Sequence, residues 1–94
     1  MSFQWDRHKA AANASKHGVT FEEAVTIFED PLARIFSDEW HSDLELREIV
    51  IGHSSAGRLL LVAFAEMPVG TIRIVSARRA TSREQRGYEE RSGS

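Results

Sequence analysis

The sequence contains no cysteine in its 94 residues. Disulfides, thiolate metal sites and cysteine nucleophiles are therefore all excluded. The longest uninterrupted apolar run, Leu59 to Ala65, is far shorter than the roughly 20 residues that a membrane-spanning helix needs. The first residues, MSFQWDRHK, also lack the apolar segment of a secretory signal peptide. We therefore expect a cytoplasmic protein that does not enter a membrane.

Several catalytic motifs are missing as well. The sequence has no Gly-rich phosphate loop, no HExxH, no paired motif of metal ligands and no nucleophile elbow. Most enzyme classes therefore have no support, and we expect neither a cofactor nor a metal site. A chain of this length makes one domain, 1–94, with a single core and a frayed tail at about 91–94. A site must then lie on a sheet surface or at the end of an element.

Charge is unevenly distributed along the chain, although the net charge is only -2. Residues 20–48 carry nine acidic side chains and two arginines, whereas residues 71–94 carry six arginines and three glutamates. Residues 1–19 are also basic, with one arginine and two lysines against one aspartate. Because such segregation matters more for partners than the average does, the two basic ends are candidate contacts for an anionic partner.

Two helices are predicted near the amino terminus. The segment Phe3 to Asp6 alternates briefly and ends in a helix cap, so we expect a short strand and then a helix from about Arg7 to His17, stopped by Gly18. Thr20 to Glu23 matches a capping box, which predicts a second helix that Pro31 ends. A second capping box, Thr81 to Glu84, predicts a last helix through about Glu90.

Between these helices the pattern changes to strands separated by turns. The strands are expected at Leu32–Phe36, Glu45–His53, Arg58–Glu66 and Thr71–Ala77, with turns at Ser37–Asp43, Ser54–Gly57 and Pro68–Gly70. The third of them is apolar on both faces and should be central. The fold class is therefore α+β, in the order β-α-α-β-β-β-β-α, with an antiparallel sheet that carries helices on one face. The other face should be partly open.

The stretch Thr71 to Thr81 joins the last strand to the last helix through two adjacent arginines. Strict alternation places Ile72, Ile74 and Ser76 on one face. It places Arg73, Val75, Ala77 and Arg79 on the other, which we assign to the open side. A strand has no structural use for several guanidiniums, which are suited to bidentate contact with phosphate or carboxylate. They are either solvated edge arginines or part of an anion-binding site.

One enzyme class needs no cofactor. Cleavage of RNA by attack of its own 2′-hydroxyl needs a proton acceptor, a proton donor and cations beside the phosphorane-like transition state. The cationic candidates are Arg58, Arg73, Arg78 and Arg79, and the candidates for proton transfer are His17, His53 and Glu66. His17 also has a simpler interpretation, since a histidine at this position can close a helix.

Several segments of the sequence carry a resemblance to a known family. They are FQWD-x₂-K-x₃-N-x₂-KHGVTFEEA-x₃-FEDP, then IGHSSAGRLLLV, then IRIVSARRAT-x₂-E-x₃-YEE. In order and spacing they resemble the BrnT toxin family over nearly the whole chain. The resemblance implies a metal-independent ribonuclease toxin with a RelE-like fold in a type II toxin-antitoxin system. It also implies a BrnA-like antitoxin of the ribbon-helix-helix class, and a complex that binds its own operator DNA.

The resemblance also implies a site. The family's activity is attributed to basic residues on the sheet and near its end, which correspond here to Arg58, Arg78 and Arg79. Chemistry adds His17 and Glu66 as catalytic candidates, and Lys16, Arg73 and Arg83 as RNA-binding candidates. The competing hypothesis is a non-catalytic module that binds nucleic acid or protein, and RNA degradation by the pure chain separates the two. A repressor acting alone is less favoured, because no helix presents a row of long polar side chains to a groove.

Overall fold

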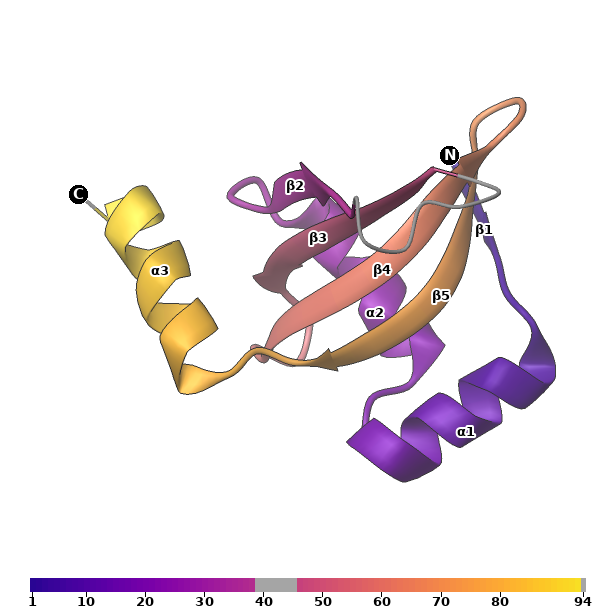
Figure 1. The fold of residues 1–94 in the computed structure, drawn as a ribbon, viewed down its shortest axis with the longest axis horizontal. Coiled ribbons are helices and arrows are strands. Elements are labelled where there is room, and N and C mark those ends of the chain that lie inside the picture. Colours follow the sequence, from indigo (N-terminus) through magenta and orange to yellow (C-terminus); the bar gives the residue numbers. More distant parts are fainter. Residues whose placement is uncertain (39–45, 94) are drawn as a thin grey trace.

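The computed structural model describes residues 1–38 and 46–93 (Figure 1). Helices α1 (Arg7–His17), α2 (Phe21–Val25) and α3 (Ser82–Gly93) and the 3-10 helix η1 (Thr26–Glu29) accompany strands β1 (Ser2–Gln4), β2 (Arg34–Ser37), β3 (Arg47–His53), β4 (Leu59–Met67) and β5 (Thr71–Arg79). This is the predicted order, with η1 continuing α2. The predicted turn from residue 39 onward and Glu45 of the predicted strand lie outside the described residues. None of the described helices is long and apolar enough to cross a bilayer.

The strands form one sheet in the order β1-β5-β4-β3-β2. The four strands β2 to β5 pair antiparallel with their sequence neighbours, and β4 is central, as predicted. The α+β fold class and the four antiparallel strands are confirmed, and the sheet as a whole is mixed because β1 pairs parallel with β5. β1 has no hairpin partner of its own, so it completes the hydrogen bonds of the outer edge of β5 beside Thr71.

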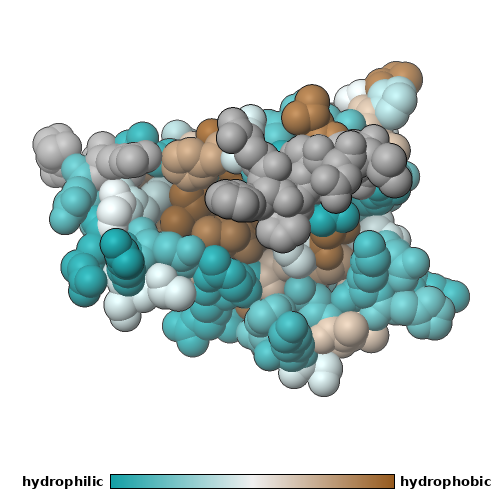
Figure 2. Space-filling view, viewed as in Figure 1, coloured by the Kyte–Doolittle hydropathy of each residue, from teal (hydrophilic) through white to brown (hydrophobic). Residues whose placement is uncertain are grey.

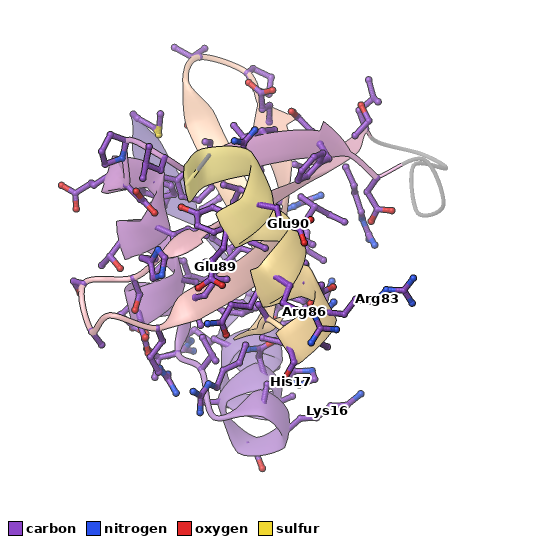
Figure 3. The ribbon with its side chains drawn as sticks, turned by 90° about the vertical axis from the view of Figure 1, so that its left-hand side faces the viewer. Lys16, His17, Arg83, Arg86, Glu89 and Glu90 are labelled. Atoms are coloured by element: carbon purple, nitrogen blue, oxygen red, sulfur yellow. The ribbon has the colours of Figure 1, made fainter. Side chains whose placement is uncertain are left out.

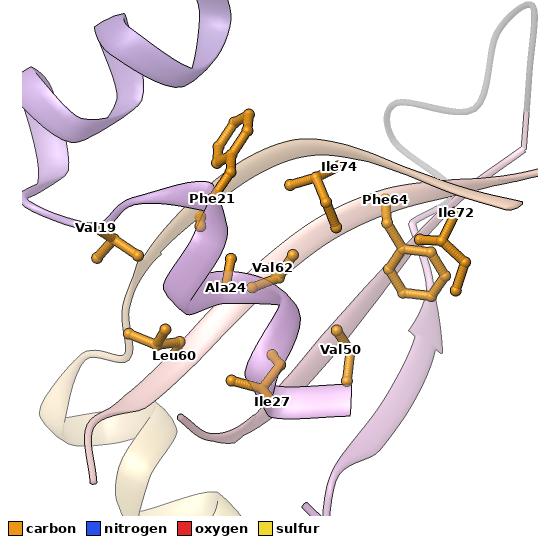
Figure 4. Close-up of a cluster of buried hydrophobic side chains, with 11 residues drawn as sticks. Val19, Phe21, Ala24, Ile27, Val50, Leu60, Val62, Phe64, Ile72 and Ile74 are labelled. Carbon is orange, nitrogen blue, oxygen red and sulfur yellow. The ribbon is translucent and has the colours of Figure 1, made fainter. Parts of the chain in front are cut away.

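The core lies between α2 with η1 and one face of the sheet (Figure 4). Phe21, Ala24 and Ile27 follow helical spacing and are fully buried. They pack with side chains from the three inner strands and the α1–α2 connection, namely Val19, Val50, Leu60, Val62, Phe64, Ile72, Ile74 and Ala77. Burying one large apolar side chain stabilises the fold by about 1.5–3 kcal/mol. This cluster therefore fixes α2 on the sheet.

The ends of α1 follow from local sequence. Asp6 is the N-cap, and its Oδ1 accepts hydrogen bonds from the backbone N–H of His8 (2.8 Å) and Lys9 (3.0 Å). Gly18 ends the helix with φ 68°, a left-handed conformation that glycine adopts without steric cost. The predicted cap and stop are both confirmed.

A β-bulge interrupts β5. Ala63 pairs with Ser76 but Phe64 pairs with Ile74, so Val75 has no partner in the ladder. Beyond this extra residue the faces of β5 are exchanged relative to strict alternation. The assignment of Arg79 to the open face is therefore wrong, because Arg79 lies opposite the buried Leu60 on the face that α2 covers.

Helix α3 does not join the other two. In Figure 1, α2 lies behind the sheet and α1 lies below it, next to β5, while α3 stands at the left side of the sheet. Its residues Gly87 and Tyr88 border a groove with Ile51 and Leu61, which point away from the core face. The prediction that the helices share one face is therefore right for α1 and α2 only. α3 follows Arg79 directly and turns toward the open face.

Candidate active site

Two arginines lie at the end of the sheet where β4 begins and β5 ends. Arg79 pairs with Leu60 in the ladder, and the backbone N–H of Ala80 donates to the Leu59 carbonyl at 2.9 Å. Arg58 precedes β4 by one residue, so alternation places it on the same face as Leu60. Arg58 and Arg79 are thus diagonal neighbours on the face that α2 covers.

Arg58 is held by Glu23, the third residue of α2. Its Nε donates to Glu23 Oε2 at 2.9 Å, and its terminal nitrogen makes a close ion pair with Glu23 Oε1. Ser54 Oγ donates to the same carboxylate at 2.7 Å. The Arg58 guanidinium, followed by the Ser54 hydroxyl, lowers the pKa of Glu23, and Glu23 in turn raises the pKa of Arg58. Both shifts favour the charged form of the pair.

The capping box at Thr20 is consequently only half formed. Thr20 Oγ1 accepts from the Glu23 backbone N–H at 3.0 Å, as predicted. The Glu23 carboxylate binds Arg58 and Ser54 in place of reaching back to the Thr20 N–H. Glu23 is thus a member of the site that the sequence analysis treated only as a helix cap.

Arg79 is exposed, and no hydrogen bond or ion pair of its guanidinium occurs within residues 1–38 and 46–93. It lies near enough to Glu23 for its charge to contribute to the lowered pKa of that carboxylate. A guanidinium that faces solvent beside another guanidinium is suited to bind an oxyanion.

The carboxyl-terminal end of α1 lies next to Arg58. The Arg58 guanidinium donates at 3.1 Å to the carbonyl of Gly18, the residue that follows His17 in the chain. His17 is partly exposed and Lys16 is exposed. Figure 3 shows both side chains at the end of α1, at the same end of the molecule as the first turn of α3 with Arg83. We call Lys16, His17, Arg58 and Arg79 the basic site.

Asn13 fixes the end of α1 against the sheet. This buried side chain donates from Nδ2 to the carbonyls of Val19 (2.9 Å) and Ala77 (2.7 Å), and its Oδ1 accepts from the Ala77 N–H at 3.0 Å. The amide thus continues the sheet where β1 has ended. Since Ala77 is two residues before Arg79, Asn13 sets the position of α1 relative to that arginine.

Arg78 faces the other side of the sheet. Its two terminal nitrogens donate to the two carboxylate oxygens of Glu84, both at 2.8 Å. Glu84 also forms a complete capping box with Thr81, with hydrogen bonds of 2.9 and 3.1 Å. Arg78, followed by the Thr81 backbone, lowers the pKa of Glu84 to about 2. Arg78 therefore anchors α3 and is separated from the basic site by the sheet, while Arg83 is exposed on the first turn of α3.

Two candidate residues lie elsewhere. Glu66 is eight residues along β4 from Arg58, which is roughly 27 Å at about 3.4 Å per residue. It lies beside Glu48, whose pKa it raises to about 7 through a shared hydrogen bond. Arg73 pairs with Ala65 near the same far end and lines a pocket of about 280 Å³ with Lys9 and Arg47. The structure therefore does not bring Glu66 or Arg73 to the basic site.

His53 lies at the same end of the sheet as the basic site, since it pairs with Leu59, but alternation places its side chain on the other face. Its backbone N–H donates to Asp30 Oδ2 at 2.7 Å, and its ring packs edge to face on Tyr88 at 5.5 Å between centroids. Tyr88 donates from its hydroxyl to the same Asp30 oxygen at 3.3 Å. These three side chains attach α3 to the end of β3. Among the described residues, no three His, Asp or Glu side chains are grouped as metal ligands would be.

Comparisons with known proteins point to one family. The family model described as "Ribonuclease toxin, BrnT, of type II toxin-antitoxin system" matches residues 5–84. Among solved structures, the chain is similar to the Brucella abortus ribonuclease toxin BrnT, with a TM-score of 0.67 and 23% identity over 87% of this chain and 99% of that one. At this identity the likeness supports the fold. A comparison with curated proteins gave no match.

Proposed function

Since the chain belongs to the BrnT family of ribonuclease toxins of type II toxin-antitoxin systems, we propose that it cleaves RNA at the basic site without a metal ion. The observation that most supports this is the placement of Arg58 and Arg79 on one face at one end of the sheet. His17 lies at the end of α1, joined to them through the Gly18 carbonyl. Cations and a titratable group are thus gathered around one surface.

The proposed reaction is an intramolecular transesterification within the RNA strand. The 2′-oxygen of a ribose attacks the neighbouring phosphorus, and the bond from phosphorus to the 5′-oxygen breaks. The products are a 2′,3′-cyclic phosphate and a free 5′-hydroxyl. One proton must leave the 2′-hydroxyl and one must reach the 5′-oxygen, while negative charge develops on the phosphoryl oxygens.

Each side chain of the basic site has a role in this reaction. Arg79 and Arg58 hold the phosphate and stabilise the developing charge, and Lys16 adds a further positive charge from α1. His17 transfers protons, because imidazole is the side chain whose ordinary pKa lies closest to neutral pH. Glu23, whose pKa is lowered, is a weak base. Its role is to position Arg58.

The proposal includes the partners. The antitoxin is a BrnA-like protein of the ribbon-helix-helix class, and the toxin-antitoxin complex binds its own operator DNA. Free toxin acts in the cytoplasm, where its RNA substrate is found. The asymmetric charge of the chain supports an antitoxin that presents acidic side chains to the basic site.

The test is cleavage of a defined single-stranded RNA by the purified chain, with and without EDTA. We expect the same rate in both and a 2′,3′-cyclic phosphate product. Arg58→Ala and Arg79→Ala should each reduce the rate by about a hundredfold, and Arg79→Lys should recover only part of it because lysine cannot make a bidentate contact. Arg7→Ala, at the opposite end of α1, is the control and should leave the rate unchanged.

Two outcomes would contradict this proposal. Loss of activity in EDTA would show that a metal takes part. RNA binding without any cleavage by the wild-type chain would favour the alternative, a non-catalytic module that uses the same basic surface to hold nucleic acid.

A further inference from the structure

An apolar groove lies on the open face of the sheet, between α3 and strands β2 and β3. Its volume is about 320 Å³. Ile49, Ile51 and Leu61 form its floor, and Phe36 at its edge is 42% exposed. Figure 2 shows a brown patch on this face, with hydrophilic residues below it.

The described fold leaves this groove uncovered. α2 packs on the opposite face of the sheet, and α1 lies next to β5. α3 borders the groove through Gly87 and Tyr88, but its anchors lie at the ends of the strands, at Arg78 and Asp30. Apolar surface of this kind, rimmed by polar side chains, typically marks a protein-binding site.

Arginines surround one end of the groove. Arg34 lines it from β2, and Arg78, the ladder partner of Leu61, lies beside it in an ion pair with Glu84, which also lines the groove. Arg83 and Arg86 are exposed on α3 (Figure 3). The apolar floor therefore leads directly to the end of the sheet that carries the basic site, on its other face. A partner that fits this surface has an apolar stripe and acidic side chains beside it.

Resting on the proposed function, we propose that the groove binds an amphipathic helix of the antitoxin. A helix with apolar residues at i, i+3, i+4 and i+7 presents a continuous stripe to such a groove. Its other face remains polar and can direct carboxylates toward the exposed Arg83 and Arg86. Binding here places the antitoxin next to the end of the sheet where RNA is cleaved without requiring it to fill the basic site.

Two variants test the groove in different ways. Phe36→Asp puts a charge at its edge, on the outermost strand, where the side chain is partly exposed. Gly87→Leu fills it: a Cβ at this helical position meets no atom within 4 Å, and leucine is a better helix former than glycine. Val69→Asp is the matched control, because Val69 is 99% exposed on the β4–β5 hairpin with φ 62°, which aspartate tolerates.

Each variant is co-expressed with the protein encoded by the reading frame adjacent to that of the toxin, and Kd is measured by titration of the purified proteins. RNA cleavage by each variant alone is measured in parallel. We expect both groove variants to weaken antitoxin binding by at least tenfold and to cleave RNA at the parental rate, while Val69→Asp changes neither.

The contrary outcomes are distinct. Parental affinity in both groove variants overturns the groove assignment and leaves the proposed function intact. A wild-type chain that binds no such neighbour overturns the antitoxin part of the proposed function, and the groove assignment with it. If the wild-type chain alone is a dimer that Phe36→Asp dissociates, the groove belongs to a second copy and the proposal is wrong.

Discussion

The side-chain amide of Asn13 pairs with the backbone of Ala77 as a neighbouring strand would, donating to its carbonyl at 2.7 Å and accepting from its N–H at 3.0 Å. A helix side chain thus supplies the edge of the sheet. The relationship matters for function because it ties the position of His17, four residues after Asn13, to that of Arg79, two residues after Ala77.

Asn13→Ala should therefore affect both stability and activity. It leaves the backbone groups of Ala77 and the Val19 carbonyl without their partner, and we expect a loss of about 2–4 kcal/mol in the free energy of unfolding. Cleavage should also fall at temperatures where the variant is still folded, since α1 is no longer fixed to β5. Chemical denaturation and RNA cleavage measure the two effects. Ser15→Ala, at an exposed position of the same helix, should change neither.

Glu23→Gln should strengthen the binding of RNA. The substitution removes a negative charge from beside Arg58 and Arg79, where it opposes the approach of a phosphate. The measurement is the Kd of an RNA whose scissile 2′-hydroxyl is replaced by hydrogen, which prevents cleavage. We also expect a lower kcat, because Arg58 loses the charged partner that positions it. Weaker binding together with unchanged kcat would contradict this role.

Glu66→Gln should stabilise the protein at alkaline pH. The raised pKa of Glu48 means that the folded state holds this proton more tightly than the unfolded state. The resulting stability is complete below the ordinary pKa of 4.5 and is lost as the pH rises to about 7. At pH 8 the variant should exceed the wild type by a few tenths to about 1 kcal/mol, allowing for solvent screening, and the difference should shrink at pH 4.5. RNA cleavage should be unchanged, since Glu66 lies far from the basic site.

Glu84→Gln should lower the free energy of unfolding at neutral pH, and this loss should become smaller as the pH falls. Its carboxylate pKa is lowered to about 2, so its contribution is complete above the ordinary value of 4.5 and is lost as the pH falls toward 2. At pH 7 we expect a loss of about 1–2 kcal/mol, because the pair with Arg78 is partly exposed. Glu90→Gln, on the exposed side of α3, is the control for denaturation at both pH values. An equal loss at pH 7 and pH 2 would contradict the assignment.

The parts of the fold that the sequence predicted correctly depend on local signals. Asp6, Gly18, Thr20 and Thr81 begin or end helices through hydrogen bonds and dihedral angles within a few residues. The central position of β4 followed from its apolar side chains on both faces. Such signals are contained in a short window of sequence and do not depend on distant contacts.

The errors came from contacts between distant residues. The parallel pairing of β1 depends on which edge of the sheet is free, and no local pattern encodes this. Glu23 has the spacing of a capping box, but Arg58, 35 residues later, takes its carboxylate. The sequence signal that could have identified this pair is a glutamate in the first turn of a helix together with a single arginine directly after the Ser54–Gly57 turn. The bulge in β5 carries neither glycine nor proline, so alternation assigned Arg79 to the wrong face.

The bulge in β5 also bears on why two arginines, Arg78 and Arg79, stand side by side at the end of the strand. If β5 paired regularly and absorbed Val75, Arg78 would replace Arg79 opposite Leu60, and the hydroxyl of Ser76 would replace Ala77 opposite Val62 in the core. A one-residue slip in most strands exchanges the inner and outer faces and destroys a site. In β5, either register places one guanidinium on the face of the basic site. The two adjacent arginines therefore preserve a cation at this site even if the strand pairs one residue out of register.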